Sequence, residues 1–159
     1  MADDGDRRRM RAIINRLGSN DVVTREMPGH ENRGGTWSRV PVGIVEHHDA
    51  ASIKSGEWGA LGLILDGTPR GIPGPLSQFQ VARCLDNVPK VAIVADGRAS
   101  HAGLGGPYRF PDGLVVPIND ANSWLYGTEV ANDGLGEAYT DACHYAIDAL
   151  CEAVMEVCG

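Results

Sequence analysis

The sequence has no excess of positive charge, no long apolar run and no dense set of cysteines. Its 14 Lys and Arg against 21 Asp and Glu give a formal net charge of −7, whereas a nucleic-acid-binding protein needs a basic face to displace counterions from phosphate. No stretch approaches the ~20 consecutive apolar residues that cross a bilayer. Four cysteines in 159 residues do not resemble a disulfide scaffold. We therefore exclude nucleic acid and membranes as partners, and we expect reduced thiols.

Several familiar signatures are also missing. Neither HExxH nor CxxC occurs, no GxSxG elbow supports a serine hydrolase, and the glycine-rich segments match neither the P-loop nor the dinucleotide fingerprint. Four arginines lie among the first eleven residues, but no apolar stretch follows them, so no secretory signal is visible. What the sequence does have is 21 glycines, many of them within 56–74 and 97–113. This composition favours long shaped loops on a rigid scaffold, where sites usually lie.

The hydrophobic pattern predicts helices at both ends of the chain. Apolar residues recur at helical spacing from Met10 to Leu17, after a possible cap at Asp6, and Gly18 supplies a stop. From about Glu137 to the end, apolar pairs repeat every four residues, which predicts an amphipathic helix of about five turns. A shorter helix is expected from about Ser55 to Gly67.

Strand-like segments alternate with these helices. We expect strands over 40–45 and 124–131, and an antiparallel hairpin formed by 78–85 and 90–95. Residues 19–36 are polar and glycine-rich, which predicts an irregular arm. The predicted fold class is α/β, with a mixed central β-sheet flanked by helices. The predicted domain division is an N-terminal helix and irregular arm over 1–39, and a folded domain over 40–159.

The histidine pair His47-His48 is the most informative polar feature, because it follows a predicted strand. Neighbouring residues of a strand face opposite ways, so only one of the two rings can enter a given pocket. Neutral imidazole is the commonest protein ligand of Zn²⁺, and packing at a strand end is the alternative interpretation. His101, within Ser100-His101-Ala102-Gly103, is a weaker candidate, and His144 is interpreted as a residue on a helix face.

Glu129 is the candidate acid–base residue. The period of the 124–131 strand puts it on the same face as Gly127, whose missing side chain leaves room beside it. A carboxylate in a central strand is costly to bury unless it is paired or functional.

The order of these pieces resembles the zinc-dependent N-acetylmuramoyl-L-alanine amidases that share a fold with peptidoglycan recognition proteins, and in particular the amidase domains of endolysins from phages of actinobacteria. The likeness runs from about Val40 to the end of the chain. It depends on three motifs in order, which are His47-His48, then Ser100 to Gly103, then Asn122-Ser123 followed by Gly127-Thr128-Glu129.

The resemblance implies roles for individual residues. His47 matches the first zinc ligand, Glu129 matches the carboxylate that orients or deprotonates the zinc-bound water, and His101 matches a histidine that lines the cleft. Zinc would lower the pKa of its bound water toward ~7. Asn122, Gln78 and His48 are candidate substrate-binding residues. Arg98 is a further candidate.

The implied function is hydrolysis of the amide between N-acetylmuramic acid and L-alanine by a monomeric endolysin, which stays in the host cytoplasm until lysis and then acts on bacterial peptidoglycan. In the family the other zinc ligands follow the terminal helix in a final strand and loop, and the 40–159 domain lacks such a segment. We therefore expect this 159-residue form to be weakly active or inactive. The alternative is a non-catalytic peptidoglycan-binding module.

Overall fold

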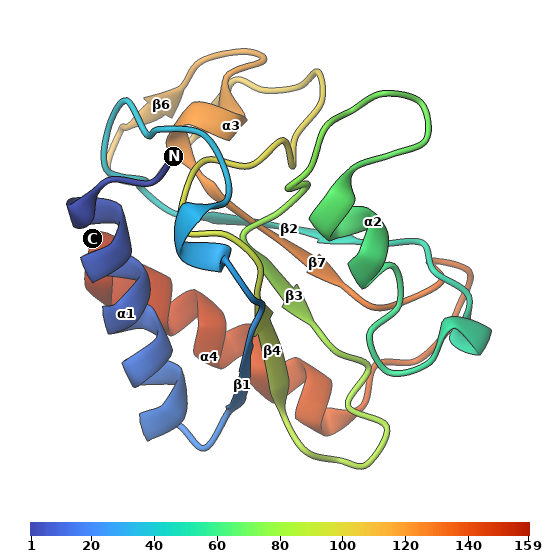
Figure 1. Ribbon diagram of the computed structural model, residues 1–159. Helices are drawn as coiled ribbons and strands as arrows, with labels where there is room; N and C mark the ends of the chain where they lie inside the picture. Colours follow the sequence, from blue (N-terminus) through green and yellow to red (C-terminus); the bar gives the residue numbers. More distant parts are fainter.

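A five-stranded mixed sheet runs through the middle of the molecule, with the strand order β1-β4-β3-β7-β2 (Figure 1). The structure is a computed structural model that describes residues 1–159. Three neighbouring pairs, β1 with β4, β3 with β7 and β2 with β7, are parallel, and β3 with β4 is antiparallel. The strands are β1 (Val23–Glu26), β2 (Ile44–His48), β3 (Phe79–Val81), β4 (Lys90–Ile93) and β7 (Tyr126–Val130).

Four α-helices and several short elements surround this sheet. The helices are α1 (Asp4–Ser19), α2 (Leu61–Asp66), α3 (Ala121–Trp124) and α4 (Asp141–Cys158), and the 3₁₀ turns are η1 (His30–Asn32) and η2 (Ile53–Ser55). A separate two-stranded sheet pairs β5 (Tyr108–Arg109) with β6 (Val115–Val116). None of the helices combines the length and hydrophobicity needed to cross a membrane.

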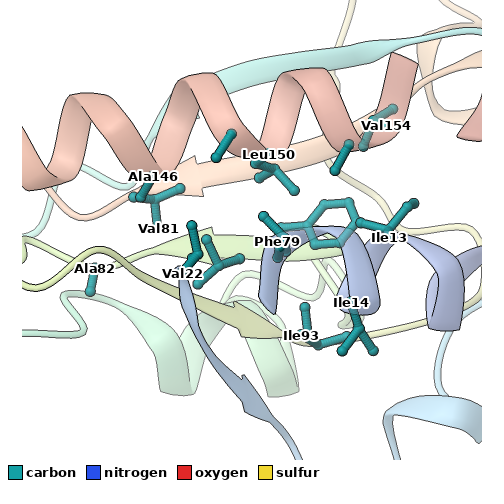
Figure 2. Packing of buried hydrophobic residues seen from close by; sticks show 14 of the residues in the cluster. Ile13, Ile14, Val22, Phe79, Val81, Ala82, Ile93, Ala146, Leu150 and Val154 are labelled. Atoms are coloured by element: carbon teal, nitrogen blue, oxygen red, sulfur yellow. The ribbon is translucent and has the colours of Figure 1, made fainter. Parts of the chain in front are cut away.

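Helices α1 and α4 cover one face of the sheet and enclose the main core. Ile13 of α1 meets Leu150 and Val154 of α4 over Phe79 of β3 (Figure 2). Leu17, one turn further along α1, belongs to the same cluster. All except Val154 rank among the largest fully buried side chains. Because each such side chain contributes about 1.5–3 kcal/mol on burial, α1 is an integral part of this core.

The predicted helices are confirmed, with corrected starts. Helix α1 is capped by Asp3, which forms a reciprocal capping box with Asp6, so Asp6 lies three residues inside the helix rather than at its cap. Helix α4 begins at Asp141 after Thr140, whose hydroxyl accepts a hydrogen bond from the Cys143 N–H. The third predicted helix is shorter than expected, because only residues 61–66 are α-helical and 53–55 form the turn η2.

The hairpin is confirmed as β3 and β4, and β7 has the predicted alternation of faces. Two strand expectations differ. Residues 23–26 of the expected irregular arm form β1, which pairs with β4 at the edge of the sheet. The strand expected over 40–45 is β2, which lies at 44–48, so the histidine pair is inside it. Backbone pairing with β7 continues through His48, and this pairing extends the strand beyond its expected end.

The second face of the sheet carries α2 and the long loops. Leu61 and Ile64 of α2 pack against Ala92 of β4 and Val94 just after it. Beyond them, the segment after β4 crosses this face, reaches His101 and continues to β5, β6 and α3 (Figure 1). The candidate site lies on this second face.

Candidate functional site

A row of three polar side chains crosses adjacent strands on the second face of the sheet. His47 of β2 is aligned with Glu129 of β7, and Glu129 is aligned with Gln80 of β3. Aligned residues of neighbouring strands share a face, so these three side chains are neighbours on the face opposite α4. The structure therefore brings together the two residues on which the predicted chemistry depends.

His47 presents a nitrogen without a protein partner. Its ring is half-buried, and its Nε2 is buried without a hydrogen bond. Burial, followed by the nearby charge of His48, lowers the pKa of His47. The imidazole is therefore held in its neutral form, which is the form that accepts a proton or binds a metal ion.

The His101 ring lies against Gly127, which precedes Glu129 by two residues on the same face of β7. A Cβ at Gly127 would overlap the His101 ring, so the glycine provides the space that the ring occupies. The Nε2–H of His101 donates to the Leu125 carbonyl (2.9 Å), and its buried Nδ1 has no protein partner. Burial lowers the pKa of His101 to about 4. The rings of His101 and His47 have centroids 6.1 Å apart, so a neutral imidazole acceptor lies beside His47.

Glu129 makes no hydrogen bond within the protein, and its carboxyl group is partly buried. Burial, followed by the negative charge of Asp49, raises its pKa to about 7. Near neutral pH both the acid and the carboxylate are therefore populated, which is the condition for a group that takes and then returns a proton. The buried Oε1 of Gln80 also has no protein partner.

Asp49 is a site residue that the sequence analysis did not select. Its carboxylate accepts hydrogen bonds from the amides of Ala51 (3.0 Å), Ala60 (2.7 Å) and Asn132 (3.2 Å), and from Nε2 of Gln80 (3.0 Å). These donors fix a carboxylate next to Glu129 at the end of β2. The available signal was its place directly after the histidine pair.

A cavity of about 200 Å³ adjoins the row. Asp49 and Glu129 supply its acidic wall, and Leu63 of α2 lies opposite. A neighbouring hollow of about 580 Å³ shares Asp49 and Leu63 and continues along the glycine-rich turn at Gly59. The two spaces share Asp49, Ala60 and Leu63, and they reach the row of polar side chains at Glu129. We call them the groove.

The largest hollow, about 620 Å³, lies on the other side of the sheet between β2 and α4. Its lining includes Glu46, His47, His48 and His144. We assign the site to the smaller cavity because Glu129, whose pKa is raised to about 7 by burial, lines that cavity and does not line the large hollow. A buried carboxyl group with a shifted pKa beside a cavity is typical of functional sites.

Of the predicted substrate-binding residues, His48 has its exposed ring against Gly134 and, at the end of β2, also lines the cavity beside Glu129. Gln78 is fully buried, and its amide donates to the Gly97 carbonyl (3.0 Å) and accepts from the Gly127 N–H (2.7 Å).

Asn122 uses both ends of its side-chain amide on the backbone of Ala102, at 2.8 and 2.9 Å. Gln78 and Asn122 therefore hold the segment around His101 in place, and neither has a free amide group to offer a ligand. The structure brings the His101 ring next to that of His47, and the role of His101 as a cleft-lining residue stays a prediction.

The donor set for a metal ion is incomplete in these residues. His47 offers one buried imidazole nitrogen, but no group of three His, Cys, Asp or Glu side chains is arranged to hold a metal ion. A catalytic zinc usually has three protein ligands. Compared with protein-family models, curated proteins and solved structures, the chain matches none of them.

Proposed function

We propose that this protein hydrolyses the amide bond between N-acetylmuramic acid and L-alanine in bacterial peptidoglycan, as a phage endolysin with an amidase-like fold. The observation that carries the proposal is the alignment of His47 with Glu129 on one face of the sheet, with Glu129 lining the groove. The ordered motifs around His47, His101 and Glu129 support the choice of substrate. In this proposal the protein is released from the host cytoplasm at lysis.

The roles of the chain's own residues follow from their protonation. The ionised form of Glu129 takes a proton from the attacking water, and the acid form then protonates the leaving amine. A pKa of about 7 makes both steps accessible at neutral pH. His101 is neutral and accepts a hydrogen bond from the substrate through Nδ1.

Zinc is the cofactor that the proposal implies, with His47 as a ligand. Since His47 is the one matched ligand and no three-residue donor group is formed, these residues do not fit a complete zinc centre. One imidazole would hold zinc weakly, so hydrolysis by this chain is expected to be slow.

A non-catalytic peptidoglycan-binding module is the second candidate, and the incomplete donor set favours it. The two functions differ in one experiment. Purified cell walls are incubated with the wild type, with Glu129→Ala and with the control His144→Ala, with and without added zinc, and turbidity and wall binding are followed.

The hydrolase interpretation predicts that Glu129→Ala lowers the rate by at least about 100-fold, with wall binding retained and with His144→Ala equal to the wild type. Binding by the wild type without hydrolysis, even with added zinc, supports the binding module instead. If the wild type neither binds nor hydrolyses cell walls, both functions are rejected.

A further inference from the structure

The N-terminal residues 30–37 are hydrogen-bonded along the segment that carries His101. The His30 carbonyl accepts from the Asp96 N–H (3.0 Å), and the Arg33 carbonyl accepts from the Gly97 N–H (3.1 Å). Gly35 and Arg98 then exchange both backbone hydrogen bonds, at 2.8 and 2.7 Å. In Figure 1 the blue turn η1 lies beside the yellow segment that leaves β4. Two stretches about 60 residues apart in sequence therefore form a short antiparallel contact.

The two backbones also touch directly. Gly34 has a φ of +93°, and a Cβ there would lie 2.7 Å from the Gly97 carbonyl carbon. A Cβ at Gly97 would in turn meet the Gly35 carbonyl oxygen. Real Cβ atoms do not approach backbone atoms this closely, so only glycine fits on both sides. The two backbone segments therefore pack so closely that a side chain at Gly34 or Gly97 would not fit between them.

The His30 side chain closes this contact from the inside. It is 7% exposed, and its Nδ1 lies 2.7 Å from Oδ1 of Asp96, which is 2% exposed. Its Nε2 lies 3.0 Å from Oε2 of Glu26, and Arg11 binds both oxygens of Glu26 at 3.1 Å. His30 is the side-chain partner of the buried Asp96 carboxylate. A buried carboxylate without a partner is costly.

From Asp96 the connection continues to the candidate site through Gly97. The Gly97 carbonyl accepts from Gln78, and the same Gln78 amide accepts from the N–H of Gly127. Gly127 is the residue against which the His101 ring packs. Each link is a buried hydrogen bond or a direct contact, so the position of the segment at 96–98 determines where the His101 ring lies.

We propose that residues 30–37 form a clamp that holds segment 94–101 on the sheet, and that His30, through Asp96, is a positioning residue for His101. The clamp gives a role to the N-terminal residues, which the likeness to amidases does not cover. The effect of the clamp on hydrolysis rests on the proposed function, whereas its effect on the position of segment 94–101 is independent of that function.

The test compares His30→Asn with His144→Asn, the same substitution at an exposed position of α4. Hydrogen–deuterium exchange is measured on peptides covering 94–101, and the His101 Nε2–H is followed by NMR. The clamp predicts that His30→Asn speeds exchange in 94–101 by about 10-fold or more, leaves α4 within about twofold of the control, and broadens the His101 signal. Unchanged protection and an unchanged His101 signal overturn the proposal.

A milder variant covers the case in which His30→Asn does not fold. Glu26 has 37% of its side chain exposed, so Glu26→Ala removes the outer hydrogen bond of His30 with little loss of packing. It is expected to speed exchange in 94–101 by about threefold relative to His144→Asn. Equal exchange in the two proteins overturns the proposal.

Kinetics on cell walls separate the clamp from the proposed function. If the wild type hydrolyses cell walls, His30→Asn is expected to lower kcat/KM by about 10-fold, because His101, the proposed hydrogen-bond acceptor for the substrate, loses its orientation. An unchanged kcat/KM alongside faster exchange overturns the positioning role. If the wild type shows no hydrolysis, the proposed function fails, and exchange and the His101 signal alone decide the clamp.

Discussion

At the scale of single residues, the site contains polar groups whose burial without hydrogen-bond partners opposes folding. Glu129 is partly buried without a hydrogen bond, Asp49 adds negative charge beside it, and Nε2 of His47 has no protein partner. A raised carboxyl pKa means that the native state prefers the protonated acid. Such groups cost stability, and their persistence in one place is typical of functional sites.

Replacing Glu129 by glutamine is expected to stabilise the protein at alkaline pH. The folded pKa of about 7 exceeds the ordinary value of 4.5, so the stability linked to the protonated acid is fully present below pH 4.5 and is lost as pH rises through 7. Glu129→Gln should flatten this fall. At pH 8 the gain is on the order of 1–2 kcal/mol, after allowance for solvent screening of a partly exposed group.

Urea unfolding of the wild type and of Glu129→Gln, from pH 4 to pH 8 in the presence of a chelator, measures this difference. The chelator removes any effect of a bound metal on the carboxyl group. The two stability curves should coincide near pH 4, diverge as the pH rises from 4.5 to 7, and keep a constant separation above that. Curves that stay parallel over this range mean that the Glu129 carboxyl group titrates as it does in the unfolded chain.

At the scale of elements, the fit between β7 and the segment around His101 decides the shape of the site. Gly127 provides the space for the ring, and Asn122 fixes the neighbouring backbone at Ala102. A strand with an ordinary side chain at 127 would push the ring away. The element that carries Glu129 therefore also determines the position of His101.

The substitution Gly127→Ala tests this fit. Its Cβ would overlap the His101 ring, so the segment must move, with a loss of stability of about 1–3 kcal/mol from overpacking. Hydrolysis of cell walls should also fall, because His101 leaves its place. Gly18→Ala is the matched control, since nothing lies within 4 Å of a Cβ there, and it should be neutral or stabilising by up to about 1 kcal/mol. Equal stability in the two variants would contradict the fit.

Local patterns were sufficient to predict some elements and not others. Helices α1 and α4 follow from apolar residues at helical spacing, and the shared face of Gly127 and Glu129 follows from the period of a strand. Strand β1 was missed because its residues are mostly exposed and show no alternation. Its conformation comes from pairing with β4, which is remote in sequence.

Local sequence patterns also could not predict the contacts of individual side chains, because these contacts join residues distant in sequence. Gln78 joins Gly97 to Gly127, which are 19 and 49 residues away from it. The resemblance to amidases suggested a substrate contact for Gln78, but its burial is a property of the assembled sheet. Asp49 was likewise visible at the end of β2, yet its closeness to Glu129 depends on the parallel pairing of β2 with β7.

At the scale of the whole molecule, both ends of the chain contribute to one core. Leu17 of α1 and Leu150 of α4 are fully buried in the same hydrophobic cluster. Strand β1 extends the same sheet, and the clamp at His30 joins the first forty residues to the candidate site. These contacts favour cooperative unfolding of residues 1–39 with the remainder of the chain, in place of an independent arm.

The substitution Leu17→Ala tests this cooperativity against Leu104→Ala, the same change at a residue that is 92% exposed. A cavity at Leu17 should cost about 2–5 kcal/mol, whereas the control should stay within about 0.5 kcal/mol of the wild type. Far-UV circular dichroism reports the helices, and fluorescence reports Trp58 and Trp124 outside residues 1–39, together with Trp37 inside them. Because α1 shares its core with α4, both signals should shift together to lower urea in Leu17→Ala. A loss of helical signal that leaves the fluorescence transition unchanged would instead mean that α1 unfolds on its own, and that the sheet and α4 are stable without it.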